Sequence, residues 1–353
     1  MPKRLDLSIR EQKNILNLMR RCQMSSAICS LICASSNDTP GFLGVFFLIG
    51  LLENATTTHP LGDRELREVS WMPDGQSLLV STAADKEAPI RIMKTDLTGK
   101  LLETYQIGEK QTANAETYFE QFQADGITVS PDGRYAAFFV RPNSASIAAD
   151  GVGIYLLDMQ QPARAEAVSG GLGYPEWFAW SPDSSKLAVI KGRGREATDN
   201  KSLAVVTASD FKVIEAGLTG FVDSWPVWSN PDAGKLYFTR GKGSTAWLGK
   251  YNPEEVMVPG QRIWERGSDG KEQPVTQGSA KTADYYPAVS PDGRQLLFVR
   301  MDGAEHGSLY VTSAGSRQET ELLRHLAGDS GFYGNYLPKW IAVYWQKETK
   351  MTG

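Results

Sequence analysis

The stretch "AVSPDGRQLLFVR" (288–300) joins two runs of apolar, largely β-favouring residues through a Ser-Pro-Asp-Gly corner. At such a corner Pro presets φ, the Asp side chain hydrogen-bonds the backbone that follows it, and Gly accepts a positive φ. The flanking runs favour strands. The stretch therefore predicts an antiparallel hairpin.

The same corner occurs five times, the other four being "SWMPDGQSLLVS" (70–81), "VSPDGRYAAFFV" (129–140), "WSPDSSKLAVI" (180–190) and "WSNPDAGKLYFTR" (228–240). The corner prolines are spaced by 58, 51, 49 and 60 residues. Repeats of about this length are typical of stacked arrays and propellers. A second hairpin is predicted after each corner, in residues 90–108, 153–170, 202–218, 262–278 and 308–326. Each unit thus holds four antiparallel strands, which is the content of one propeller blade.

These corners and hairpins resemble the TolB-like six-bladed β-propeller family, whose repeats carry a Trp-Ser-Pro-Asp-Gly corner. The resemblance covers about residues 66–345. It implies an all-β, six-bladed β-propeller of four-stranded antiparallel blades, and it implies no particular activity because such folds host many functions. The sixth blade is predicted to be incomplete, since "NYLPKWIAVYWQK" (335–347) lacks the corner. Residues 340–346 are expected to form a strand that is covered by residues 54–65 or by a partner.

Charge and cysteines divide the chain into a leader and a body. Net charge is −4; residues 1–52 carry six Lys/Arg and three acids, which leaves +3 there and −7 in the remainder. An acidic body argues against binding nucleic acid, which needs a basic face. All three cysteines (Cys22, Cys29 and Cys33) lie in the leader, so the body holds no disulfide and no cysteine metal site.

The predicted domains are a leader, residues 1–53, and a propeller, residues 54–353. Basic residues precede two apolar runs, 24–34 and 41–52, and neither reaches the roughly 18 residues of a comfortable membrane span. The main expectation is a helical or apolar anchor that stays uncleaved and holds the body on the periplasmic, extracytoplasmic face. One alternative is a cleaved signal and a secreted protein. Another is a buried or disordered leader on a cytosolic protein.

Signatures of catalysis are missing from the sequence. It has no Gly-x-Ser-x-Gly elbow, and the glycine run 169–173 lacks the Lys-Ser/Thr of a P-loop. His306 lies near Asp302 and Glu305, and an exposed turn residue explains it more simply than a metal ligand. The corner aspartates are interpreted as turn-stabilising residues: Asp74, Asp132, Asp183, Asp232 and Asp292. We therefore predict no catalytic residue, no metal and no cofactor.

The strand before each corner is expected to line the central channel of a propeller, with its start at the channel mouth. Acidic and aromatic residues recur at these positions, which are Asp125, Glu176, Trp177, Asp223, Trp225, Asp284, Tyr285, Tyr286 and Tyr336. Their convergence would form an acidic funnel with an aromatic rim, suited to a polar peptide, a cation or a basic segment. The alternative is that Trp177, Trp225 and Tyr286 pack between blades as core residues.

Together these features predict a non-enzymatic extracytoplasmic propeller. It would act as an interaction or scaffold subunit of a membrane-associated assembly, with envelope, respiratory and photosynthetic complexes all open. Its expected partners are proteins, with the membrane contacted through the N-terminal segment and no nucleic acid bound. The alternative function is a propeller enzyme of the lyase or glycosidase kind, built on funnel carboxylates such as Asp223 and Asp284.

Overall fold

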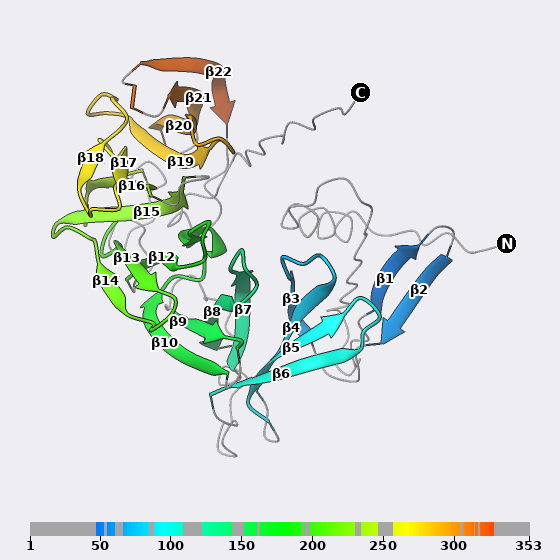
Figure 1. The fold of residues 1–353 in the computed structure, drawn as a ribbon. Helices are drawn as coiled ribbons and strands as arrows, with labels where there is room; N and C mark the ends of the chain where they lie inside the picture. The colour runs from blue at the N-terminus through cyan, green and yellow to red at the C-terminus, as the bar shows by residue number, and fades with distance from the viewer. Residues whose placement is uncertain are drawn as a thin grey trace. The chain divides into compact units, whose positions relative to one another are not determined.

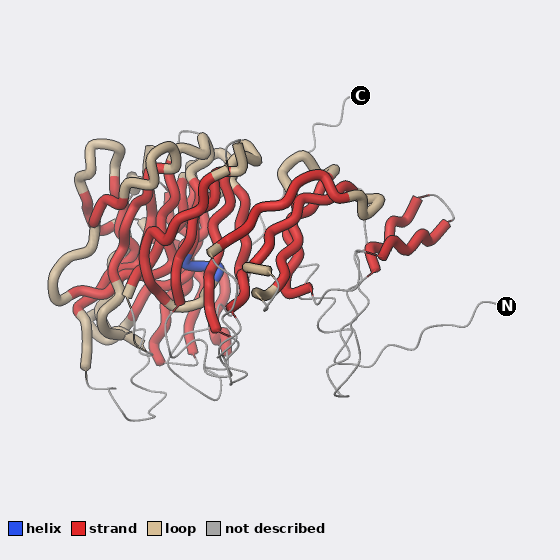
Figure 2. Tube along the Cα trace, turned by 90° about the horizontal axis from the view of Figure 1, so that it is seen from below, coloured by secondary structure: helices blue, strands red, loops and turns tan. Residues whose placement is uncertain are grey.

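The computed structural model describes residues 47–52, 55–60, 66–84, 88–108, 122–142, 152–160, 163–192, 194, 198–229, 234–245, 257–303, 306–313, 315–316 and 318–327, with only the backbone path given up to residue 60. Strands make up nearly all the regular structure of these residues, and one short helical turn, η2 (Pro175–Trp177), accompanies them (Figure 2). No helix among the described residues is long and apolar enough to span a membrane.

Twenty of the strands form five four-stranded sheets, each built from strands in chain order (Figure 1). Sheet 1 contains β3 (Leu66–Trp71), β4 (Ser77–Thr82), β5 (Ile90–Asp96) and β6 (Leu101–Ile107). Sheet 2 contains β7 (Phe122–Val129), β8 (Tyr135–Pro142), β9 (Val152–Asp158) and β10 (Arg164–Gly171). Sheet 3 contains β11 (Phe178–Trp180), β12 (Lys186–Lys191), β13 (Ser202–Thr207) and β14 (Val213–Glu215). Sheet 4 contains β15 (Phe221–Trp228), β16 (Leu236–Lys242), β17 (Arg262–Arg266) and β18 (Glu272–Pro274). Sheet 5 contains β19 (Ala283–Val289), β20 (Gln295–Gly303), β21 (His306–Ser313) and β22 (Glu319–Ala327).

This topology confirms the all-β fold class and the four-stranded antiparallel unit, and it is consistent with a propeller. In sheets 1, 2, 3 and 5 the corner joins the first two strands, and in every sheet the predicted second hairpin forms the last two. The predicted sixth blade and its strand at 340–346 lie outside the described residues, so the number of blades stays a prediction.

The N-terminal apolar run ends in a strand. β1 (Phe47–Leu52) pairs antiparallel with β2 (Ala55–Pro60), with Leu52 opposite Ala55 at the turn. The end of the run that the sequence analysis assigned to a helical or apolar leader is therefore extended. Residues 1–46 lie outside the described part of the chain, and the anchor and signal alternatives both stay predictions.

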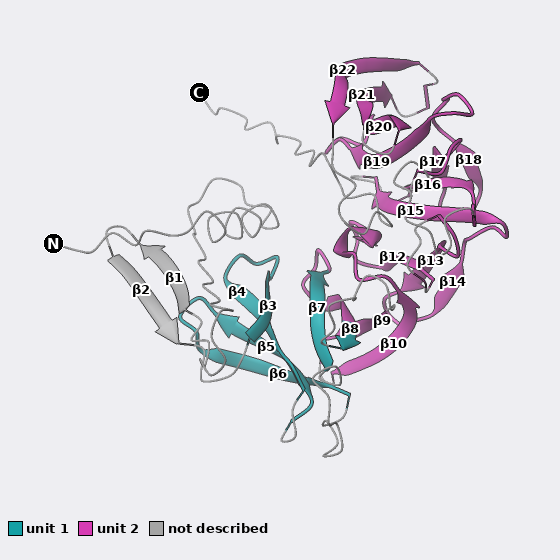
Figure 3. Cartoon of the chain, turned by 180° about the vertical axis from the view of Figure 1, so that it is seen from behind, with its two compact units in different colours: residues 1–129, 140–143 teal, residues 130–139, 144–353 magenta. Residues whose placement is uncertain are grey.

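The chain divides into two compact units (Figure 3). Unit 1 holds residues 1–129 and 140–143, and unit 2 holds residues 130–139 and 144–353. Within unit 1 the first strand of sheet 1, β3, contacts the first strand of sheet 2, β7. Within unit 2 β11 contacts β15, and β15 contacts β19. First strands of successive sheets therefore lie next to each other, as they do in a propeller.

Sheet 3 shows why so many strands are apolar on both faces. Alternate side chains of a strand point to opposite faces of its sheet. In β12, Leu187 and Val189 pack into a core shared with sheet 2, whereas Ala188 and Ile190 pack into a core shared with sheets 4 and 5. A sheet between two others has no solvent face, so its central strands read as continuous apolar runs.

Each complete Ser-Pro-Asp corner closes through the same hydrogen bonds. In sheet 2, Ser130 Oγ donates to Asp132 at 2.6 Å, the Arg134 N–H donates to Asp132 at 3.0 Å, and the Gly133 N–H donates to the Ser130 carbonyl at 2.9 Å. Equivalent bonds from Ser181 and Ser290 hold Asp183 and Asp292 at 2.6 Å. These carboxylates are turn-stabilising groups, as the sequence predicts; Asp232 lies outside the described residues.

Candidate functional site

The first strands of sheets 4 and 5 contain the same backbone irregularity. The register shifts between Ser224 and Val227 in β15, and between Tyr285 and Ala288 in β19. Within these bulges Trp225 has φ 54° and Tyr286 has φ 57°, a left-handed conformation that bulky residues rarely adopt. The bulge therefore directs one aromatic side chain of each strand into the protein.

The two bulge aromatics pack on each other. The Trp225 and Tyr286 rings meet edge to face with centroids 4.6 Å apart. Both are buried, together with Trp177 of η2 and Tyr285, in the apolar core of sheets 3 to 5. The packing is that of core residues; whether any of these rings also contacts a ligand stays a prediction.

Beside Trp225, Asp223 forms a buried ion pair with Arg240 of β16. The guanidinium donates two hydrogen bonds, Nε to Oδ1 at 2.6 Å and Nη2 to Oδ2 at 3.1 Å. The two side chains are 1% and 0% exposed. Arg240 Nη1 also pairs with Glu272 of β18. Within sheet 4, Arg240 is therefore ion-paired with two carboxylates, Asp223 and Glu272.

The same pair joins sheet 4 to sheet 3. The Leu203 N–H donates to Asp223 Oδ2 at 2.9 Å, and Arg240 Nη2 donates to the Ala216 carbonyl at 2.8 Å. The Asp223 N–H donates to the Lys201 carbonyl at 3.0 Å. The Asp223–Arg240 pair therefore links two neighbouring sheets.

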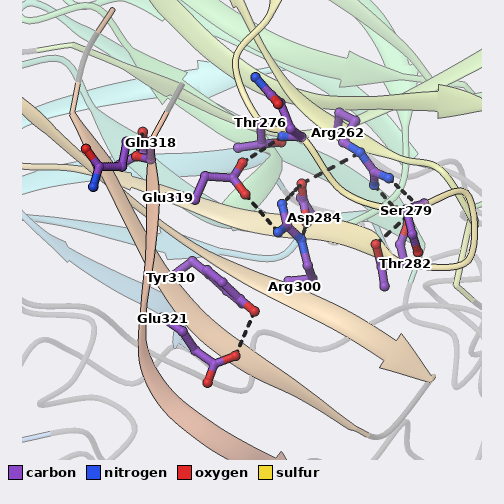
Figure 4. Close-up of polar contacts among 12 residues, drawn as sticks. Arg262, Thr276, Ser279, Thr282, Asp284, Arg300, Tyr310, Gln318, Glu319 and Glu321 are labelled. Atoms are coloured by element: carbon purple, nitrogen blue, oxygen red, sulfur yellow. Dashed lines mark hydrogen bonds and ion pairs between the residues drawn. The ribbon is translucent and has the colours of Figure 1, made fainter. Parts of the chain in front are cut away.

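Sheet 5 repeats the arrangement around Asp284 (Figure 4). Arg300 of β20 donates Nε to Asp284 Oδ1 at 2.8 Å and Nη2 to Oδ2 at 3.0 Å, while its Nη1 donates to Glu319 of β22 at 2.8 Å. Arg262 of sheet 4 approaches Asp284 with Nε 3.9 Å from Oδ2. The Asp284 N–H donates to the Gln261 carbonyl at 2.9 Å, just as Asp223 does to Lys201.

A related pair occurs in unit 1. Asp125 of β7 pairs with Arg141 of β8, and Gln123 Nε2 donates to the same carboxylate at 3.3 Å. Counted back from the end of the first strand, Asp125 is one position later than Asp223 and Asp284, next to Gly126, whose φ is 63°. Sheet 2 thus has the same kind of aspartate–arginine pair, although its aspartate lies one residue closer to the corner than the aspartates of sheets 4 and 5.

Burial and pairing shift the pKa of these groups. Burial raises the pKa of Asp223, and the hydrogen bonds and charge of Arg240 offset part of that rise. Burial alone would lower the pKa of Arg300, but its hydrogen bonds to Asp284 and Glu319 outweigh this and hold the pKa above its usual range. Burial raises the pKa of Tyr285 and Tyr286.

The remaining predicted residues are placed as follows. Glu176 is exposed in η2, and the Tyr285 hydroxyl accepts the Val258 N–H at 3.0 Å. Tyr336 lies outside the described residues. Among the described residues no group of three or more His, Cys, Asp and Glu is arranged to hold a metal ion. His306 is exposed at the start of β21.

Sequence reasoning found the aspartates and missed the arginines. The signal was present as Phe-x-Arg at the end of the corner hairpin, in residues 139–141, 238–240 and 298–300. Residues i and i+2 of a strand share a face. The guanidinium therefore lies over the ring two residues earlier, at 4.7 Å for Arg240 over Phe238 and 5.3 Å for Arg300 over Phe298. From there it reaches the aspartate opposite.

Comparison with known proteins finds solved structures of low sequence identity. No protein-family model matches the chain, and no curated protein matches it. A solved structure described as a putative TolB from Agrobacterium tumefaciens is 17% identical, with 77% of this chain and 87% of that chain covered, at a TM-score of 0.39. An oligogalacturonate lyase from Vibrio parahaemolyticus is 14% identical over 78% and 71% of the two chains, at a TM-score of 0.44. Dipeptidyl peptidase 4 from Porphyromonas gingivalis is 14% identical, over 72% of this chain and 39% of its own, at a TM-score of 0.49.

Proposed function

We propose that the chain is a six-bladed, TolB-like β-propeller that acts as a non-enzymatic protein-interaction subunit of a membrane-associated assembly. The proposal places the propeller on the extracytoplasmic face, tethered through its basic and apolar N-terminal segment. The sixth blade would come from residues outside the described part of the chain.

The observation that carries the proposal is the state of the inner-strand carboxylates. Asp223 and Asp284 are the carboxylates that the enzyme alternative takes as its example of a catalytic pair. Each accepts two hydrogen bonds from an arginine, and neither side chain is more than 1% exposed. A general acid or nucleophile must reach its substrate. These two carboxylates are instead engaged in holding sheets together.

Exposed apolar side chains on the last strands of two sheets also support the proposal. Leu101 and Leu102 on β6, and Leu322 and Leu323 on β22, are consecutive exposed pairs on the last strands of their sheets. Single exposed apolar residues are ordinary, whereas leucines exposed on two outer strands are available for contact with another protein.

The test is migration of the tagged full-length chain after gentle solubilisation of membranes from cells that express it naturally. We expect it to run with a larger assembly. Asp223→Asn and Asp284→Asn should weaken that association only as far as they destabilise the propeller, which thermal unfolding measures. Migration of the wild-type chain alone would contradict the proposal. Turnover of an acidic oligosaccharide that both substitutions abolish without unfolding would favour the enzyme alternative.

A further inference from the structure

The aspartate–arginine pair of sheet 2 is less enclosed than the pairs of sheets 4 and 5. The Asp125 side chain is 21% exposed and the Arg141 side chain is 15% exposed, whereas the aspartates of sheets 4 and 5 are no more than 1% exposed. Gln123 lies two residues before Asp125 on β7 and therefore on the same face of the strand. All three residues belong to unit 1 (Figure 3).

The hydrogen bonds of this group are incomplete. Arg141 contacts the Oδ2 atom of Asp125 through Nε and Nη2, and Gln123 Nε2 donates to the same oxygen at 3.3 Å. Among the described residues, Arg141 Nη1 and Gln123 Oε1 have no hydrogen-bond partner, although both atoms are buried. No described residue donates to Asp125 Oδ1 either. The group therefore has one donor nitrogen and two acceptor oxygens that are unused.

Sheets 4 and 5 show which partner is missing from sheet 2. There a glutamate of the last strand pairs with the Nη1 atom of the arginine, Glu272 in sheet 4 and Glu319 in sheet 5. The only acid of β10, the last strand of sheet 2, is Glu166, and it pairs with Arg164 of the same strand. An unpaired buried donor or acceptor costs free energy. A ligand that pairs with the unused atoms of sheet 2 recovers that cost.

The orientation of the Gln123 amide follows from its neighbour. Its N–H donates to the Asp125 carboxylate, whereas a flipped amide would set two acceptor oxygens against each other. The unused atom of Gln123 is therefore the oxygen. Gln123 itself is only 5% exposed. A ligand reaches it after the more exposed Asp125 and Arg141 side chains shift, as side chains at interfaces commonly do.

A primary carboxamide matches the unused atoms. Its two N–H groups donate to Gln123 Oε1 and Asp125 Oδ1, and its carbonyl accepts from Arg141 Nη1. An ammonium or guanidinium group has no acceptor for the arginine, a carboxylate has no donor, and a hydroxyl has only one. The N–H and C=O of a trans peptide group point in opposite directions. A water molecule carries the required donors and acceptors, and the experiment below distinguishes it.

We propose that Gln123, Asp125 and Arg141 form a binding site for a primary carboxamide, and that the ligand is an asparagine or glutamine side chain of a partner protein. The identity of the ligand as a side chain rests on the protein interaction proposed above. The binding of the carboxamide group does not.

The experiment measures binding of Nα-acetyl-asparagine methylamide to the purified full-length chain by saturation-transfer NMR. The matched ligand is its derivative with two methyl groups on the side-chain nitrogen, which keeps the carbonyl and has no side-chain N–H. We expect the first ligand to bind with a Kd in the millimolar range, because it is a small fragment of a partner. The second should bind about tenfold more weakly, because it cannot donate to the two acceptors.

Gln123→Leu is the main variant, because leucine is of similar size and removes the buried acceptor. It should weaken binding about tenfold, and its thermal midpoint should not fall, because an unpaired acceptor has been removed. Gln261→Leu is the matched control. Gln261 of sheet 4 also has a buried Oε1 without a partner among the described residues, but its amide nitrogen donates to Thr239 and not to a carboxylate. This substitution should leave binding unchanged.

Three results would overturn the proposal. If the wild-type chain binds neither ligand, the unused atoms take water alone. The other two are equal binding of both ligands, and equal losses of binding in Gln123→Leu and Gln261→Leu. If Gln123→Leu does not fold, Arg141→Lys replaces it, because lysine keeps the charge opposite Asp125 but has a single nitrogen. Unchanged binding by that variant would equally overturn the site.

The two proposals fail separately. A chain that binds no carboxamide can still migrate with a larger assembly, which would overturn the site and keep the interaction function. A chain that binds the carboxamide but migrates alone would keep the site and contradict the assembly.

Discussion

The Asp223–Arg240 cluster of sheet 4 and the Asp284–Arg300 cluster of sheet 5 have the same residues in the same register, yet they differ in burial and in how they reach the preceding sheet. Arg240 is 0% exposed and donates directly to a carbonyl of sheet 3. Arg300 is 14% exposed and reaches sheet 4 through Asp284 and the separate residue Arg262. The neighbouring sheet, and not the pair itself, decides how completely the ions are enclosed.

This difference predicts the largest effect for Arg240→Ala. The substitution leaves Asp223 buried without its counter-ion, which costs about 3–5 kcal/mol of unfolding free energy. Chemical denaturation of the two proteins measures the loss. Arg164→Ala is the control, because its pair with Glu166 is about half exposed and such surface pairs contribute little to stability. Equal losses for the two variants would show that burial of the Asp223 pair is not what matters.

Arg300→Ala should cost less, about 1.5–3 kcal/mol. It removes charged hydrogen bonds to Asp284, but water can enter at the partly exposed site and Arg262 remains close to the carboxylate. The same denaturation series checks the order of the two arginines. A loss for Arg300→Ala that exceeds the loss for Arg240→Ala would reverse the comparison.

Gly278→Ala tests Arg262, the residue of sheet 4 that approaches Asp284 of sheet 5. A Cβ at Gly278 would lie 2.7 Å from Arg262 Cζ and from Thr282 Oγ1. Arg262 cannot move freely, because its guanidinium donates to the carbonyls of Gln261 and Thr282 at 2.5 and 2.8 Å. We expect about 1–2 kcal/mol of destabilisation. Ser279→Ala is the control, because it keeps the backbone carbonyl to which Arg262 donates. Gly220→Ala would not serve, because the φ of Gly220 is positive and an alanine there would be strained.

The smallest effect is expected at a corner outside both clusters. The Ser181 hydroxyl and the Ser185 backbone N–H hold the pKa of Asp183 below its usual range. Its ionised form therefore stabilises the fold above the unfolded pKa of about 3.9, and that contribution disappears as pH falls through the folded value. Asp183→Asn should cost roughly 0.5 kcal/mol at pH 7, since the group is solvent-screened. Thermal melts between pH 7 and 3 check this: the gap between the two proteins should narrow on acidification, and a gap that widens would contradict the assignment.

Much of the fold could be predicted from the sequence, because its determinants are local. A corner such as Ser290-Pro-Asp-Gly closes through hydrogen bonds among residues within five positions of each other. Period-two alternation assigns the faces of the flanking strands. The four corners within the described residues and the strands of the five second hairpins therefore appear where the sequence places them. The strand at 47–52 is different, since the short apolar run 41–52 fits strand and helix equally well.

The sequence predicted the aspartates of the candidate site but not the arginines that pair with them. Asp223 and Asp284 could be singled out as polar residues before a corner, and Phe-x-Arg could have been noticed after it. The role of these acids depends on pairing with arginines that lie 16 and 17 residues away on the next strand, and on a carbonyl of another sheet. The left-handed bulge that turns Trp225 and Tyr286 inward has no glycine to mark it in either strand.

The sequence by itself determined the four-stranded unit, its repetition and the strands that hold Asp125, Asp223 and Asp284, because turns and alternation act over a few residues; Glu176 and Trp177, expected on a strand, lie in the helical turn η2. Only the tertiary structure decided that Asp223 and Asp284 are enclosed by arginines and not open to solvent. Enclosure is a property of two neighbouring sheets. A charge becomes buried only when a second sheet removes its water, and its partner must then be supplied by a residue far away in the chain.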